Sequence, residues 1–158
     1  MKPYVLALVM LAAPLAQAAD APGLTYYIQL VRGSDQDSPP AAQAKLVGAR
    51  LDQRLHDIFK WKNYWEVKRE TVTLHRGMKT RCEMSAQREV EIDWNSPKQL
   101  MISLYNDGKL TRKREQSIDT KFYIAGGDRD AADSWFIIVR KDNPGASQDM
   151  NTKLAGMP

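Results

Sequence analysis

The stretch that most constrains the fold lies at residues 44–74, where a helical pattern runs directly into a strand pattern. Apolar side chains recur at the spacing of one face of an amphipathic helix, namely at Val47, Leu51, Leu55, Ile58 and Phe59. Charged side chains fill the positions between them, as on a solvated face. The sequence therefore predicts one amphipathic helix whose apolar face packs on another element.

A strand is expected to follow this helix, because aromatic and then β-branched side chains dominate the next dozen or so residues. In a regular strand Trp65 and Val67 would point to one face, whereas Val72 and Leu74 would point to the other. A strand with a period of two cannot change its buried face without an irregularity. We therefore expect a β-bulge or a strong twist near residues 68–70.

The remainder of the chain reads as short strands joined by turns, with no alternation of strands and helices. In residues 89–94 the apolar side chains alternate strictly with acidic ones. Residues 106–108, Asn-Asp-Gly, form the clearest hairpin signal, because these residue types tolerate a positive φ. The strand at residues 109–118 is highly charged and is expected at a sheet edge. Residues 135–139 are apolar on both faces, which places that strand in the interior.

These patterns predict an α+β fold that is mainly β. We expect an antiparallel meander of about eight strands, folded as a sandwich or partial barrel, with the one amphipathic helix packed on it.

The first 18 residues have the pattern of a signal peptide, with Lys2 ahead of an apolar run and small residues at the cleavage site. The apolar run of roughly a dozen residues is too short to span a bilayer, which needs about 20. We expect cleavage after Ala18 or Ala19. The predicted location is the periplasm or the cell exterior, with no transmembrane segment left after cleavage.

The rest of the chain is expected to form one domain. Residues 19–142 have the length and composition of a single globular β-rich domain. Residues 143–158 contain several glycines and prolines and few large apolar side chains, so we expect a mobile C-terminal tail.

The formal net charge is +4, and the basic residues concentrate in residues 60–81 and 109–114. Basic patches can bind nucleic acid, but an exported protein rarely meets any, so nucleic acid is not an expected partner. Anionic polysaccharide, lipid headgroups or an envelope protein fit the predicted compartment better. The alternative is that these residues form an ordinary solvated strand face.

Cys82 is the single cysteine, which excludes an intramolecular disulfide. It is expected to be a buried small hydrophobe, with a free thiol or an intermolecular link as alternatives. The chain has only two histidines and no nucleophile or metal-ligand motif. No catalytic residue, metal site or cofactor is therefore predicted.

Several sequence features resemble a group of small exported bacterial proteins, in which a helix precedes an antiparallel β-meander. The features are the run FKWKNYW at residues 59–65, the strand ending at residues 72–74, and Gly126-Gly127 ahead of Trp135. The resemblance covers most of the mature chain. It implies no known activity and assigns no site residues.

The most suggestive functional group is the basic aromatic segment after the helix. Trp61, Lys62, Tyr64 and Trp65 form a candidate binding surface, because aromatic side chains supply contact area and cations attract an anionic partner. The alternative is that these aromatic side chains seal the helix against the sheet. We expect an exported, non-enzymatic binding or assembly domain of the bacterial cell envelope that contacts a protein partner.

Two other functions are alternatives. Glu89, Glu91 and Asp93 alternate on one strand, and such residues lie about 7 Å apart, a separation compatible with a weak glycoside hydrolase. An outward charged stripe is also what any half-solvated strand shows. The third possibility is a module that binds envelope polysaccharide or lipid.

Overall fold

The computed structural model describes residues 22–130 and 133–145. The predicted signal peptide, its cleavage site and most of the predicted tail lie outside these residues. Within them the chain forms nine strands and one helix: β1 (Leu24–Ser34), β2 (Lys45–Leu46), α1 (Ala49–His56), β3 (Asn63–Leu74), β4 (Lys79–Glu83), β5 (Arg88–Asp93), β6 (Gln99–Asn106), β7 (Lys109–Ser117), β8 (Phe122–Asp130) and β9 (Asp133–Arg140).

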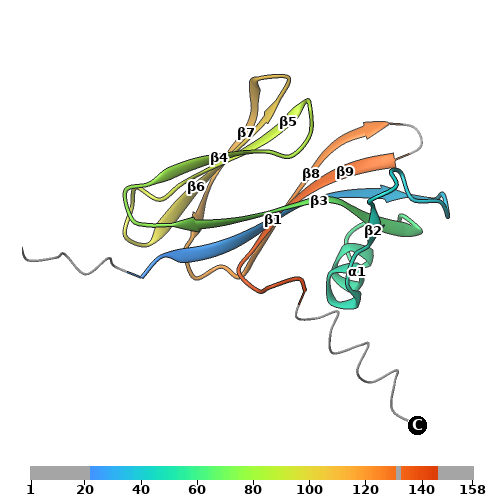
Figure 1. The fold of residues 1–158 in the computed structure, drawn as a ribbon, viewed down its shortest axis with the longest axis horizontal. Helices are drawn as coiled ribbons and strands as arrows, with labels where there is room; N and C mark the ends of the chain where they lie inside the picture. Colours follow the sequence, from blue (N-terminus) through green and yellow to red (C-terminus); the bar gives the residue numbers. More distant parts are fainter. Residues whose placement is uncertain (1–21, 131–132, 146–158) are drawn as a thin grey trace, which may run out of the picture.

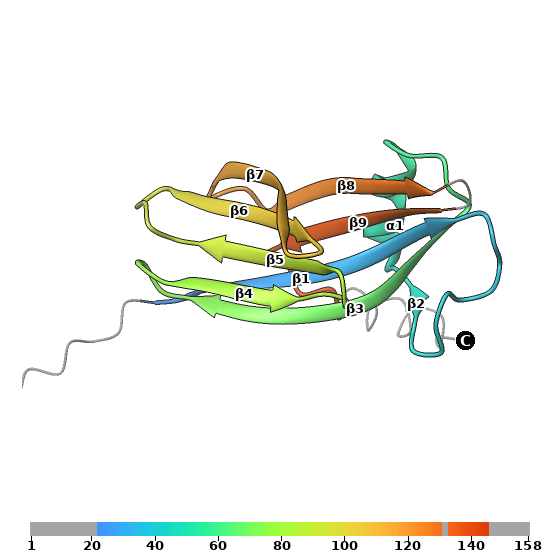
Figure 2. The ribbon, with the colours of Figure 1, turned by 90° about the horizontal axis from the view of Figure 1, so that it is seen from above.

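The strands form two antiparallel sheets (Figure 2). The four-stranded sheet is a meander in the order β4-β5-β6-β7, whereas the five-stranded sheet has the order β2-β3-β1-β9-β8. In the second sheet β1 pairs with both β3 and β9, so strands from the two ends of the chain are neighbours. The predicted class, α+β and mainly β, is confirmed.

The larger core lies between the two sheets. From the five-stranded sheet it takes Ile28 and Leu30 of β1, and from the four-stranded sheet it takes Val90 and Ile92 of β5, all of them fully buried. The acidic residues that alternate with Val90 and Ile92 stay partly exposed. The predicted inward and outward faces of this strand are therefore correct.

The opposite face of the five-stranded sheet carries α1 (Figure 1). Leu51 and Leu55 of the helix are buried against Phe136 and Ile138 of β9. The molecule thus has three layers, with the five-stranded sheet in the middle. Strand β9 is covered on both faces, as the apolar run at residues 135–139 predicts.

The helix is shorter than its apolar pattern predicts. It ends at His56, and the amide groups of both Ile58 and Phe59 donate to the Leu55 carbonyl oxygen in a tightened last turn. Phe59 still packs on the helix-side core, but Ile58 is 62% exposed. The expectation that Ile58 belongs to the buried helix face is wrong, because the chain leaves the helix before that position.

Strand β3 contains the expected irregularity, which lies just before the predicted residues 68–70. Leu30 pairs with Lys68 and Val31 pairs with Glu66, so Val67 is the extra residue of a bulge. As a result Tyr64 packs under α1, whereas Leu74 packs in the core between the sheets. A regular strand would have placed both on one face.

The predicted hairpin is confirmed between β6 and β7, where Asp107 and Gly108 have φ values of 47° and 72°. Strand β7 forms an edge of the four-stranded sheet, and nearly all its side chains are exposed. Its charge therefore lies where lysine and arginine discourage unwanted strand pairing.

Candidate functional site

Two of the four residues proposed as a binding surface are buried. Tyr64 is fully buried and Trp65 is 8% exposed. The Tyr64 hydroxyl donates to the Leu55 carbonyl oxygen at 3.3 Å, and its ring meets the His56 ring edge-on. Tyr64 therefore seals the helix against the sheet, which leaves Trp61 and Lys62 as the accessible part of the predicted surface.

Trp61 is half-buried and lies directly over Gly33 of β1. A Cβ atom added at Gly33 would stand 2.5 Å from Trp61 Cδ1 and 3.0 Å from a ring carbon of Phe136. The indole thus needs the glycine beneath it. This contact holds Trp61 at the end of the five-stranded sheet.

Lys62 is exposed and works mainly as a tether. Its ammonium group donates to the Asp37 carboxylate at 2.9 Å, and its backbone amide donates to Asp35 Oδ1 at 3.1 Å. The hydrogen bond from Lys62 lowers the pKa of the Asp37 carboxyl. Lys62 therefore fixes the loop after β1 against the start of β3.

A groove at this end of the molecule has a volume of about 650 Å³. We call it the aromatic groove, and its lining residues are Asp35, Ile58, Phe59, Lys60, Trp61, Gly126, Ser134 and Phe136. The rings of Phe59 and Phe136 lie 4.5 Å apart in its floor. The exposed Ile58 side chain stands at its rim, so the groove offers a largely apolar surface to solvent.

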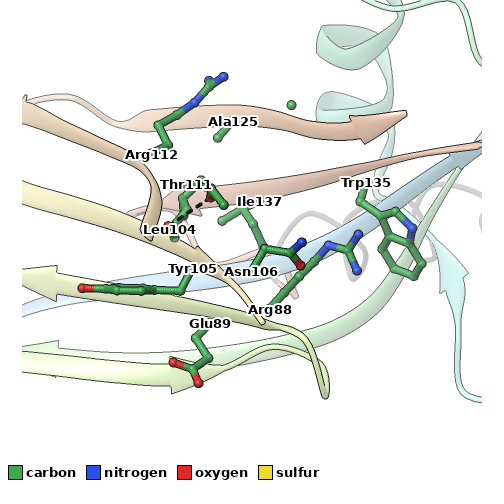
Figure 3. Close-up of a pocket in the computed structure, with 11 residues that line it drawn as sticks. Arg88, Glu89, Leu104, Tyr105, Asn106, Thr111, Arg112, Ala125, Trp135 and Ile137 are labelled. Atoms are coloured by element: carbon green, nitrogen blue, oxygen red, sulfur yellow. Dashed lines mark hydrogen bonds between the residues drawn. The ribbon is translucent and has the colours of Figure 1, made fainter. Parts of the chain in front are cut away.

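A second recess lies between the sheets (Figure 3) and has a volume of about 230 Å³. The Arg88 guanidinium lies 4.9 Å from the centre of the Trp135 ring, and Arg32 lies 5.6 Å from the same ring. Thr111 donates to the Leu104 carbonyl oxygen at 3.1 Å across the β6–β7 pair. Two of the side chains that line this cleft, Arg88 and Trp135, are thus in contact with each other.

The acidic strand does not present two carboxylates across a recess. Glu89 forms an ion pair with Arg81, and Glu91 lies 3.9 Å from the Lys79 ammonium group. Of the three acidic residues, Glu89 lines the cleft between the sheets, and Figure 3 shows its carboxylate pointing away from the centre of that cleft. A hydrolase would need a second carboxylate facing the first across bound substrate.

A third recess was missed by the sequence reasoning. It runs between α1 and the ends of β8 and β9, has a volume of about 360 Å³, and is lined by Arg50, Leu51, Arg54, Lys121, Phe122, Arg140, Lys141 and Asp142. We call it the cationic groove. Arg50 and Arg54 were interpreted from the sequence as part of a solvated helix face. The arginine pair at i and i+4 was the only local signal, because the other cations come from distant segments.

Cys82 is half-buried beside the core between the sheets, and burial raises the pKa of its thiol. This environment suits a small hydrophobic residue rather than a reactive thiolate. Among the described residues no group of three or more His, Cys, Asp or Glu side chains is placed to hold a metal ion.

The predicted tail is described only at its start. Pro144 is buried, and Gly145 lies next to the Arg69 guanidinium, so residues 143–145 lie against the protein. The prediction of mobility concerns residues 146–158, which are outside the described part of the chain.

Comparison of the chain with protein-family models, with curated proteins and with solved structures gave no match. The resemblance drawn from residues 59–65 therefore stays a prediction. In the part of the chain that the structure describes, no helix has the length and apolar character needed to cross a bilayer.

Proposed function

We propose that this protein is an exported, non-enzymatic binding or assembly domain of the bacterial cell envelope. It contacts a protein partner, and the aromatic groove receives an apolar side chain of that partner. Export rests on the signal-peptide pattern of the first 18 residues. The preference for a binding role over the hydrolase alternative is supported by the ion pairs that Glu89 and Glu91 form with Arg81 and Lys79.

The observation that carries the proposal is the exposed Ile58 beside a groove with an aromatic floor. Ile58 is 62% exposed, although the same apolar helix pattern buries Leu51 and Leu55. Single exposed apolar side chains are common on protein surfaces, but one that adjoins an apolar recess forms part of a larger continuous patch, and such patches mark interaction sites. The groove volume of about 650 Å³ is large enough for one or two partner side chains.

The test is capture of proteins from the envelope fraction by the immobilised mature protein. The diagnostic variant is Ile58→Asp, which places a charge at the rim of the groove without touching a buried side chain. The matched control is Leu110→Asp on β7, because Leu110 is 52% exposed and receives the same chemical change. Thermal melts of both variants verify that each one folds.

We expect the wild type and Leu110→Asp to capture the same partner and Ile58→Asp to lose it. A partner retained by Ile58→Asp would overturn the proposal, as would equal loss in both variants. If Ile58→Asp instead abolishes self-association in sedimentation experiments, the occupant is a second copy of this chain, and the proposal of a separate partner fails.

A further inference from the structure

The cationic groove concentrates positive charge from three separate parts of the chain. Arg50 and Arg54 come from α1, Lys121 precedes β8, and Arg140 and Lys141 come from the end of β9. Asp142 is the one carboxylate among the lining residues. Five cationic side chains thus face a single acidic one.

Arg140 is a buried side chain whose orientation at this site is fixed by hydrogen bonds. It is only 4% exposed, yet its guanidinium lines the groove, where it donates through two nitrogens to the Asp142 carboxylate. Arg50 lies 3.8 Å from the same carboxylate. A bidentate pair of this kind fixes the guanidinium in place, because both hydrogen bonds define its plane.

Arg54 and Lys121 differ from these arginines, since neither has a carboxylate partner among the described residues. Both side chains are exposed at the groove. Arg54 lies over the Phe122 ring at 4.9 Å from its centre, and Arg140 lies 5.4 Å from the same ring. Cations stacked on an aromatic ring keep their outer donors directed toward solvent or a ligand.

The floor of the groove is apolar. Phe122 is half-buried, and Leu51 is buried beside it. A ligand that fits this surface therefore needs an apolar portion for the floor and an anionic group for the rim.

We infer that the cationic groove binds a phosphate group carried on an apolar body. A phosphate monoester carries about −1.5 to −2 charges near neutral pH, which matches the excess of cations better than a single carboxylate does. Arginine donates to phosphate through two nitrogens, and lysine adds a point charge. The groove volume of about 360 Å³ accommodates a phosphate together with a small apolar group.

The same chemistry has two sources, an anionic phospholipid headgroup and a soluble phosphate ester. Calorimetric titration with phenyl phosphate tests the soluble source. Sedimentation with vesicles that contain phosphatidic acid, whose headgroup is a phosphate monoester, against phosphatidylcholine vesicles, tests the lipid source. Both measurements use the folded mature protein.

The diagnostic variant is the double substitution Arg54→Gln with Lys121→Gln. Both side chains are exposed, so the fold is retained. The matched control is Lys98→Gln with Lys113→Gln, which removes the same charge from two exposed positions, one in the turn before β6 and one on β7. We expect the groove variant to weaken binding about tenfold or more, because it removes charge-assisted hydrogen bonds. The control should change affinity about twofold or less, through long-range electrostatics that salt screens.

Binding of phenyl phosphate that the groove variant loses and the control keeps supports the site with a soluble ligand. Binding of vesicles that contain phosphatidic acid alone, with the same variant pattern, supports the site with a lipid ligand. Equal weakening by both double variants would show attraction to net charge alone and overturn the inference. Failure of both probes to bind at low salt would also overturn it. Neither result depends on the partner proposed for the aromatic groove.

Discussion

The aromatic groove and the cationic groove lie at the two ends of the strand pair that α1 covers. Gly126 pairs with Phe136 at one end, and Phe122 pairs with Arg140 at the other. The aromatic groove takes four consecutive residues, 58–61, from the segment that leaves the helix. The cationic groove is assembled from residues 50–54, 121–122 and 140–142. The charged groove thus lies against α1 itself, whereas the aromatic groove is formed by the segment that follows α1.

Only the aromatic groove is formed in large part by residues that are consecutive in the sequence. Side chains that follow one another at a helix end can be recognised by pattern alone. Lys121, Arg140 and Lys141 come together only when β8 and β9 pair beneath the helix, so a local pattern cannot reveal their cluster. In the sequence each of them is an ordinary residue at the end of a strand. Residues of α1 line the cationic groove, whereas the segment that follows α1 lines the aromatic groove. Substitutions that act on both grooves or on one of them can therefore be compared.

The largest effect is expected from Leu55→Ala, which should disturb both grooves together. Leu55 is fully buried between α1 and the five-stranded sheet, and its truncation should cost about 2–5 kcal/mol of unfolding free energy. A chemical melt measures this loss. Leu110→Ala, at a 52% exposed position, is the control and should change stability by about 0.5 kcal/mol or less. An unchanged midpoint for Leu55→Ala would contradict the three-layer fold.

A smaller and more local effect is expected from Gly33→Ala. The added Cβ would meet the Trp61 indole at 2.5 Å, and such overpacking costs about 1–3 kcal/mol. We expect the near-ultraviolet circular dichroism to change as the indole shifts, while phenyl phosphate binding at the cationic groove stays the same. Gly48→Ala is the matched control, since a Cβ there meets nothing within 4 Å. Equal destabilisation by both substitutions would rule out the close packing of Trp61 on Gly33.

The cationic groove should show its own pH dependence through Asp142. Hydrogen bonds from Arg140 lower the pKa of the Asp142 carboxyl. The contribution of this group to stability is therefore complete above the ordinary carboxyl pKa, near 4, and is lost as the pH falls through the lowered folded pKa. Urea melts of wild type and Asp142→Asn should differ at pH 6 and converge toward pH 3. A stability difference that grows on acidification would reverse the assigned sign.

The smallest effect is expected in the four-stranded sheet, because none of its residues lines either groove. Cys82→Ala should leave partner capture and phosphate binding unchanged. The native thiol should react slowly with a thiol reagent at neutral pH, because burial raises its pKa. Rapid stoichiometric labelling of the folded protein would contradict the structural role of Cys82.

Much of the fold could be predicted from short-range pattern. Strict alternation placed Val90 and Ile92 in the core. The turn-forming residues Asp107 and Gly108 marked the hairpin, and an uninterrupted apolar run marked β9 as an interior strand. The face change in β3 also followed from alternation, because Tyr64 and Leu74 cannot share a face once a bulge intervenes.

The rest depended on contacts between distant residues. The pairing of β1 with both β3 and β9 joins the two ends of the chain and leaves no local signature. Burial of Tyr64 depended on where α1 lands. Trp65 is buried as well, so the candidate surface reduced to Trp61 and Lys62. The basic clusters seen in the sequence also differ from the cluster that the fold assembles. The cationic groove contains no residue from 60–81 or from 109–114.

The most direct test of two separate grooves is a titration of ¹⁵N-labelled protein with phenyl phosphate, during which the amide chemical shifts are recorded. The account predicts saturable shifts at Leu51, Phe122 and Lys141, with the amides of Ile58 and Trp61 unmoved. Shifts spread over the basic residues of β3 and β7 would contradict it, because they would show that phosphate follows net charge rather than the groove between α1, β8 and β9.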